Sequence, residues 1–232
     1  DIDKHVIDLK RFPSDHIEVG ATPIKTSHGY LLIYSHIQNY FSSAQNLDRV
    51  FGFEAFLLDL NDPTKIVGRT VGPILVPTEP YELFGYMSNI IFPSSAILRK
   101  DKLSIYYGAA DTTICVAHVN IHDLIFTMLP ETSGDFYLKR ANTNPILLPL
   151  KDHPWESKAV FNPAALRIRN TTHILYRTLS EDNTSYIGYA SSKDGVKIDE
   201  RLPEPIYSPR EDFEIKKVAG GNSGCEDPRL TK

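Results

Sequence analysis

The stretch KLSIYYG at residues 102–108 decides the fold, because the chain contains two further versions of it. These are GYLLIYS at 29–35 and THILYRT at 172–178, so that one tyrosine returns at intervals of about 70 residues. A second run rich in aromatic and β-branched residues follows each version, as FEAFLLDL, TTICVAHV and SYIGYASS. Short runs of this composition, bounded by Gly, Pro, Asp and Asn, predict β-strands. The repeated tyrosines are Tyr34, Tyr107 and Tyr176.

Two proline motifs recur with the same spacing and define the repeating unit. The first reads GPILVP, NPILLP and EPIYSP, and the second reads IIFPSSAIL, VFNPAALRI and CEDPRL. An all-β unit of about four strands that repeats along a chain predicts a β-propeller, in which each blade packs against its neighbours. We expect three to four blades. A β-sandwich is the alternative, although sandwiches need not repeat in sequence. One short helix is predicted at 120–129, with Asn120 as its N-cap.

Composition argues against several classes of partner. The chain is 41% hydrophobic and 23% charged, as in an ordinary globular domain, and its net charge is -4. Its 25 Lys and Arg are scattered, so neither nucleic acid nor a membrane surface is an expected partner. Cys115 and Cys225 lack metal-ligand spacing and are expected to be reduced, buried thiols, and no metal site is predicted. Without an evident signal segment or a run long enough to span a bilayer, a cytoplasmic location is expected.

Longer motifs resemble glycoside hydrolase family 130, the mannoside phosphorylases and related β-mannosidases. Residues 131–232, with NPILLP, VFNPAALRI, LYRT and GCEDPR, resemble the N-terminal part of the family. Residues 1–130, with PIKT, LLDLNDP, GPILVP and YYGAADT, resemble its C-terminal part. The resemblance implies a five-bladed propeller, with the two parts in swapped order and the middle missing. A fragment across tandem modules, a permuted protein and joined separate pieces all stay open as explanations.

The resemblance also implies a reaction. Family members of the phosphorylase type cleave β-mannosides with inorganic phosphate and release α-mannose 1-phosphate. The implied ligands are a mannose-containing oligosaccharide and phosphate as co-substrate, with no cofactor, and self-association into a homo-oligomer is left open. Two alternatives remain. One is a hydrolase that uses water and needs an additional carboxylate base, and the other is a noncatalytic sugar-binding propeller.

By resemblance, Asp227 of EDPR is the proton donor, which acts through a sugar hydroxyl while phosphate attacks the anomeric carbon. One protein carboxylate then suffices. Glu226 is not expected to act with Asp227, because adjacent side chains of an extended segment point to opposite faces. Arg229 lies two residues on and is predicted to share the face of Asp227 and to bind sugar or an anion. From the residues alone, an Asp before Pro is equally typical of a turn.

Four further residues match binding positions of the family. Asn162 and Arg177 match residues that hydrogen-bond the transferred sugar, with a loop cap and a position at a blade edge as their structural alternatives. Asp111 of GAADT matches a carboxylate that holds mannosyl hydroxyls, and a hairpin-turn role is its alternative. His36 of YSH lies one residue away from the phosphate-binding histidine of the family motif YHG, and a buried structural histidine is its alternative.

Overall fold

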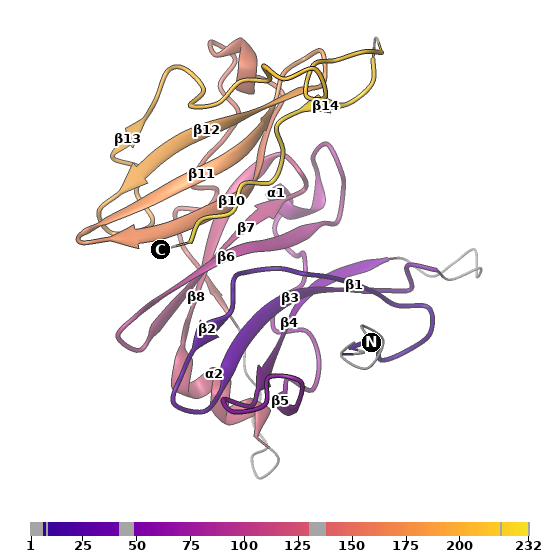
Figure 1. The fold of residues 1–232 in the computed structure, drawn as a ribbon, viewed down its shortest axis with the longest axis vertical. Coiled ribbons are helices and arrows are strands. Elements are labelled where there is room, and N and C mark those ends of the chain that lie inside the picture. The colour runs from indigo at the N-terminus through magenta and orange to yellow at the C-terminus, as the bar shows by residue number, and fades with distance from the viewer. Residues whose placement is uncertain (1–6, 8, 42–48, 130–137, 219, 232) are drawn as a thin grey trace.

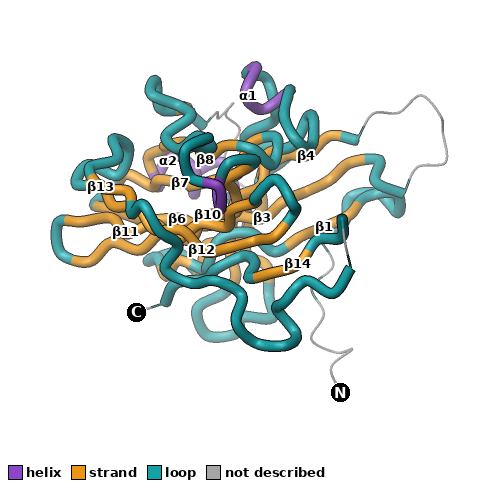
Figure 2. Tube along the Cα trace, turned by 90° about the horizontal axis from the view of Figure 1, so that it is seen from above, coloured by secondary structure: helices purple, strands orange, loops and turns teal. Residues whose placement is uncertain are grey.

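The chain folds into three antiparallel sheets that follow one another in sequence. The computed structural model describes residues 7, 9–41, 49–129, 138–218 and 220–231. Figure 1 shows the sheets stacked along the long axis of the molecule, from indigo through magenta to orange. In the view from above, strands and loops make up almost all of the trace and helices are short (Figure 2). The prediction of an all-β, partial propeller is confirmed, and the three sheets agree with the three to four blades expected.

The first sheet is formed before residue 70. Its main path is β1-β3-β4-β5, and β2 pairs with β3. The register pairs Tyr34 with Glu54 and His36 with Gly52 across β3 and β4. The strands are β1 (His16–Glu18), β2 (Ile24–Lys25), β3 (Tyr30–Gln38), β4 (Val50–Leu58) and β5 (Ile66–Arg69).

The second sheet has the order β6-β7-β8-β9. Its strands are β6 (Ile91–Arg99), β7 (Lys102–Ala109), β8 (Thr113–Asn120) and β9 (Lys139–Arg140). Helix α1 (Pro80–Leu83) precedes β6, and α2 (Ile121–Met128) follows β8. The predicted helix is thus confirmed, and the side chain of Asn120 caps it by accepting a hydrogen bond from the amide of His122. Because β9 completes a sheet begun before residue 130, the predicted division into 1–130 and 131–232 does not coincide with a boundary between sheets. That division stays a prediction.

The third sheet has the order β10-β11-β12-β13, and β14 pairs in parallel with β12. Its strands are β10 (Ala159–Ile168), β11 (Thr171–Leu179), β12 (Thr184–Ser192), β13 (Glu200–Arg201) and β14 (Ser223–Gly224), with the 3-10 helix η2 (Pro154–Glu156) before them. A bulge interrupts the β10–β11 register between Phe161 and Ala164. β10 packs against β6 and β7 of the second sheet, and β4 packs against β6. The sheets are therefore held together face to face, as blades are.

Each sheet is associated with one buried glutamate, which accepts a hydrogen bond from the repeated tyrosine and pairs with an arginine of the last main strand. We call this arrangement the Tyr–Glu–Arg cluster. The three glutamates are completely buried, so their charges depend on these partners. The tyrosine hydroxyls donate at 2.6, 2.8 and 3.0 Å and the arginine Nη2 atoms lie at 3.2, 2.8 and 2.6 Å, in the clusters Tyr34–Glu54–Arg69, Tyr107–Glu82–Arg140 and Tyr176–Glu156–Arg201.

The arginines also tie the sheets to neighbouring chain segments. Arg140 donates to the carbonyl of Val76, and Arg201 donates to the carbonyl of Leu148. These carbonyls belong to the repeated PILVP and PILLP motifs, so the second and third clusters each hold the proline motif that leads into their own blade. The repeated tyrosines of the sequence are thus one member of each Tyr–Glu–Arg cluster.

Within the described residues, the two α-helices have four and eight residues, and no helix has the length and apolar character needed to traverse a membrane. Both cysteines are free. Cys115 is buried as predicted, whereas Cys225 is only half-buried because it lies in the extended segment after β14.

Candidate active site

Three of the predicted residues, Asp111, Asn162 and Asp227, line one pocket of about 300 Å³. They come from different parts of the chain: the β7–β8 turn, the bulge of β10 and the segment after β14. The first sheet supplies another wall. The remaining lining residues are Glu18, Tyr40, Arg49, Phe51, Met87, Ile90 and Phe92.

Asp227 is held by the two residues that were predicted to bind sugar. Asn162 donates from Nδ2 to Asp227 Oδ1 at 2.8 Å, and Arg177 Nη1 lies 3.4 Å from the same oxygen. The side chain of Asp227 is 44% exposed, which leaves the carboxylate accessible from the pocket. The structure therefore brings Asp227, Asn162 and Arg177 together.

Two contacts hold the side chain of Arg177 in place, in addition to those with the carboxylates of Asp227 and Glu226. Its Nε donates to Ser185 Oγ at 3.1 Å, and its guanidinium lies 4.8 Å from the centre of the Phe161 ring. Its Nη2 donates to Glu226 Oε1 at 2.5 Å. Arg177 therefore contacts both Glu226 and Asp227, although an extended segment would separate their side chains. The reason is that Asp227 has φ +49°, so the segment turns at this residue.

The left-handed backbone region recurs around the pocket. Asp111, Asn162 and Asp227 have φ values of 48, 47 and 49°, and Ala110 has 48°. Asn and Asp accept this conformation more easily than most residues, but it still costs free energy. Three such residues lining one pocket, with Ala110 next to one of them, are typical of a site where the backbone directs side chains toward a ligand. The turn geometry and the candidate role are thus compatible for Asp111 and Asp227.

The surroundings of Asp111 in the pocket raise the pKa of its carboxyl group. Burial raises its pKa to about 6, Arg177 lowers it, and the charges of Asp227 and Glu18 raise it. A carboxyl group in this range changes its charge close to neutral pH. Perturbed acids in a cleft are candidates for a functional role.

Arg229 and His36 are not brought to the pocket lining. Arg229 is exposed and donates from Nη1 to the backbone carbonyls of Asp227 and Pro228, so it braces the segment that carries Asp227. The guanidinium of Arg229 therefore contacts the backbone and does not line the pocket.

His36 is completely buried in the first sheet. Its Nε2 lies 3.0 Å from Asp15 Oδ2, and its Nδ1 lies 2.9 Å from Glu54 Oε1. Burial alone would lower its pKa, but the hydrogen bonds and charges of Glu54 and Asp15 raise it. A phosphate dianion at His36 would meet two carboxylates, and no described contact joins His36 to Asp227. The one-residue displacement from the family motif thus corresponds to a side chain inside the sheet.

Sequence reasoning missed Glu18, Tyr40 and Arg49, which form one wall of the pocket. Glu18 Oε1 lies 3.4 Å from His16 Nε2, the imidazole stacks on Tyr40 at 4.6 Å, and Arg49 lies 4.8 Å from the Tyr40 ring centre. Glu18 lies five residues before the PIKT motif that carries the resemblance, and this position is the only hint that the sequence offers.

Comparison with known proteins identifies the same family that the sequence motifs resemble. The model of the family described as beta-1,4-mannooligosaccharide phosphorylase matches residues 9–129 and 138–232. A 1,2-beta-oligomannan phosphorylase from a Thermoanaerobacter species is 37% identical over 113 residues, which are 49% of this chain and 36% of that protein. A beta-1,2-mannobiose phosphorylase from Listeria innocua is 34% identical over 53% of this chain and 33% of its own length.

Among solved structures, the Listeria innocua beta-1,2-mannobiose phosphorylase in complex with beta-1,2-mannobiose has 35% sequence identity and a TM-score of 0.42. The matched part covers 48% of this chain and 30% of that one. The alignments with these relatives thus span about a third of the relatives' length.

Proposed function

We propose, from the premise that this chain belongs to glycoside hydrolase family 130, that the protein cleaves β-mannosides with inorganic phosphate and that Asp227 is the proton donor. The relatives named above are phosphorylases of β-linked mannosides. The observation that carries the proposal is the position of Asp227, which lines the pocket while Asn162 and Arg177 hold one of its oxygens.

In the proposed reaction a phosphate oxygen bonds to the anomeric carbon of the mannosyl group, and the bond from that carbon to the glycosidic oxygen breaks. The departing oxygen takes up a proton that originates on Asp227 and passes through a sugar hydroxyl. The products are mannose 1-phosphate and the shortened saccharide. Such general acid catalysis typically contributes a factor of about 10² to 10⁴ in rate.

The other residues have supporting roles in this proposal. Asn162 and Arg177 orient Asp227 and bind sugar hydroxyls, and the carboxylate of Asp111 accepts hydrogen bonds from a vicinal diol. Arg229 steadies the backbone at Asp227. Arg49 is the positively charged residue among those that line the pocket, which makes it the candidate for attracting phosphate.

Hydrolysis is the second candidate, and Glu18 is the observation that favours it. An inverting hydrolase needs one carboxylic acid and one carboxylate that activates water. Glu18 lines the same pocket as Asp227, is 41% exposed, and pairs with His16. In this reaction Glu18 takes a proton from water as the water oxygen bonds to the anomeric carbon, while Asp227 again protonates the leaving group.

Phosphate dependence and the variant Glu18→Gln together separate the two reactions. Phosphorolysis gives mannose 1-phosphate only when phosphate is supplied, and Glu18→Gln leaves that rate within a few-fold or raises it, because a negative charge near the phosphate is removed. Hydrolysis gives free mannose without phosphate, and Glu18→Gln lowers it by about 10² or more. Ion chromatography of the products measures mannose 1-phosphate and free mannose, and Asp212→Asn serves as the control variant. Equal mannose release with and without phosphate would refute phosphorolysis.

The acidity of Asp111 predicts a pH dependence of substrate binding. Its pKa of about 6 means that the carboxylate form, which accepts hydroxyl hydrogen bonds, grows as pH rises through that value. We expect kcat/KM to rise over this range and then to level off, because this ratio reports the free enzyme. Asp111→Asn should raise KM and remove this limb of the profile. A wild-type profile that stays flat between about pH 5 and 7 would contradict the assignment.

A further inference from the structure

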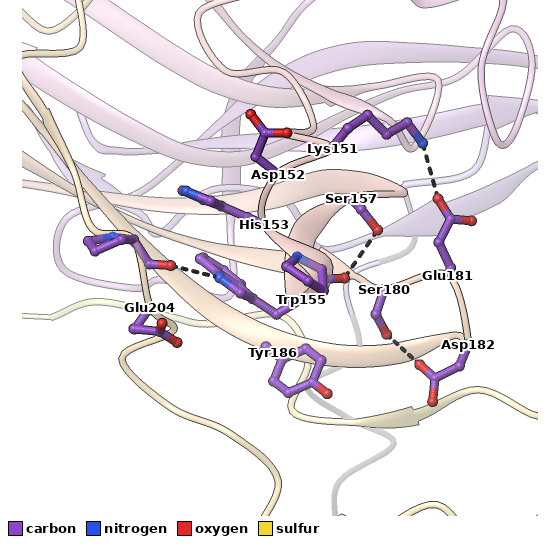
Figure 3. Close-up of a pocket in the computed structure, with 12 residues that line it drawn as sticks. Lys151, Asp152, His153, Trp155, Ser157, Ser180, Glu181, Asp182, Tyr186 and Glu204 are labelled. Atoms are coloured by element: carbon purple, nitrogen blue, oxygen red, sulfur yellow. Dashed lines mark hydrogen bonds and ion pairs between the residues drawn. The ribbon is translucent and has the colours of Figure 1, made fainter.

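A second and larger groove lies on the third sheet, away from Asp227. It has a volume of about 880 Å³ and shares no lining residue with the pocket of Asp227. Three segments form it: residues 151–157 around η2, residues 180–186 between β11 and β12, and residues 203–204 after β13 (Figure 3). Cavities of this size commonly hold small ligands.

Aromatic side chains form the floor of the groove. Figure 3 shows the ring of Tyr186 beside Trp155. The indole Nε1 of Trp155 donates to the carbonyl of Pro203 at 3.0 Å, and His153 stacks on the indole at 6.0 Å with 15° between the rings. Trp155 is thus fixed and largely buried, whereas Tyr186 is half-buried and makes no described side-chain hydrogen bond. Tyr186 therefore offers both an apolar ring face and a hydroxyl to a ligand.

Carboxylates surround these rings, and two of them lack a partner within the described part of the chain. Glu181 pairs with Lys151 at 3.0 Å, and Asp182 accepts from Ser180 at 2.5 Å. Asp152 and Glu204 have no described hydrogen bond or ion pair. They lie on the rim near His153 and Trp155 (Figure 3).

This charge distribution selects the ligand class. The lining holds four carboxylates and one lysine, and Lys216 outside the lining lies 3.8 Å from Asp182, so the groove keeps an excess of negative charge that disfavours an anionic ligand. A metal ion is also disfavoured, because the described residues contain no group of three or more His, Cys, Asp or Glu side chains placed to hold one. Carboxylates that accept paired hydroxyl hydrogen bonds beside an aromatic ring suit a neutral polyhydroxylated molecule.

We propose that this groove binds a neutral saccharide, with Tyr186 packing against a sugar ring and with Asp152 and Glu204 accepting hydroxyl hydrogen bonds. The site is separate from the pocket of Asp227 and needs no chemistry there. A bound saccharide chain would be held by the third sheet independently of its cleavage.

The test is an amide NMR titration of the protein with β-1,4-mannotriose at millimolar concentration. We expect chemical-shift changes at residues 151–157, 180–186 and 203–204 that saturate separately from changes at residues 111 and 162. The variants Tyr186→Ala and Glu204→Gln should each weaken the groove response by about tenfold or more, which corresponds to about 1.4 kcal/mol. The control Asp212→Asn, an exposed acid outside the groove, should leave it unchanged.

Each outcome decides the proposal. Groove shifts that survive Asp227→Asn but are lost in Tyr186→Ala, with its other amide shifts native-like, support it even if the protein proves inactive toward mannosides. No groove shifts at saturating mannotriose overturn it. Equal groove shifts with calcium chloride alone overturn it in favour of a cation site.

Discussion

We expect that replacing Asp227 with Asn will lower the proposed rate of mannoside cleavage by about 10² to 10⁴, because the departing oxygen would then leave without a proton. Asn keeps the shape of the side chain, and its Oδ1 still accepts the hydrogen bond from Asn162. The loss should therefore appear in kcat with little change in binding of the intact saccharide. Steady-state kinetics with a mannobiose substrate measures both terms, and Asp212→Asn serves as the control of equal charge change.

A substrate with a good leaving group sharpens this test. A nitrophenyl mannoside needs little protonation of its departing oxygen, so Asp227→Asn should retain a much larger fraction of wild-type activity toward it. If the variant loses both activities equally, Asp227 positions the substrate and does not donate the proton. If it loses neither, Asp227 is a turn residue and the proposal for this pocket is wrong.

Replacing Glu82 with Gln is expected to lower the free energy of unfolding by about 3 to 5 kcal/mol, the cost of breaking a buried ion pair by removing one partner. Glu82 is completely buried and accepts from Tyr107 at 2.8 Å and from Arg140 Nε and Nη2, both at 2.8 Å. Its Oε2 also accepts from the amides of Thr78 and Glu79. Burial would raise the pKa of Glu82, but Arg140 and the amides of Thr78 and Glu79 lower it.

The matched control is Glu181→Gln, which breaks the exposed pair with Lys151. Exposed pairs contribute about 0 to 1 kcal/mol, so this variant should unfold within about 1 kcal/mol of the wild type. Urea denaturation followed by far-ultraviolet circular dichroism gives both values. Equal stability of the two variants would mean that the Tyr–Glu–Arg clusters are not what fixes the blades.

The strand pattern was predictable because it depends on local composition. Aromatic and β-branched runs between turn residues form β3, β7 and β11. Asn120 is the N-cap of α2, because its side chain can accept a hydrogen bond from an amide of the first turn. The glutamates of the three clusters were not predictable in the same way. Glu82 and Glu156 precede the first strand of their sheets, whereas Glu54 lies on β4, so no common spacing connects them to the tyrosines.

The candidate site was predicted only where the chain matches motifs of the family. Asn162, Arg177 and Asp227 meet as those motifs implied, but the pocket wall of Glu18, Tyr40 and Arg49 carries no motif of its own. The behaviour of Glu226 was also missed, because the expected extended segment turns at Asp227. His36 shows the opposite case, where a motif displaced by one residue left the side chain inside a sheet between Asp15 and Glu54.

By itself, the sequence determined the all-β repeat, the family and the residue types available for chemistry, since strand propensity and motif identity are properties of short segments. Only the tertiary structure decided which carboxylates share a pocket and which are neutralised in the core. Asp227 and Glu54 are both acidic residues with arginine partners, yet one is 44% exposed at a pocket and the other is completely buried. That difference arises from how the three sheets pack against one another, and it sets the solvation and the charged neighbours on which the acidity of each group depends.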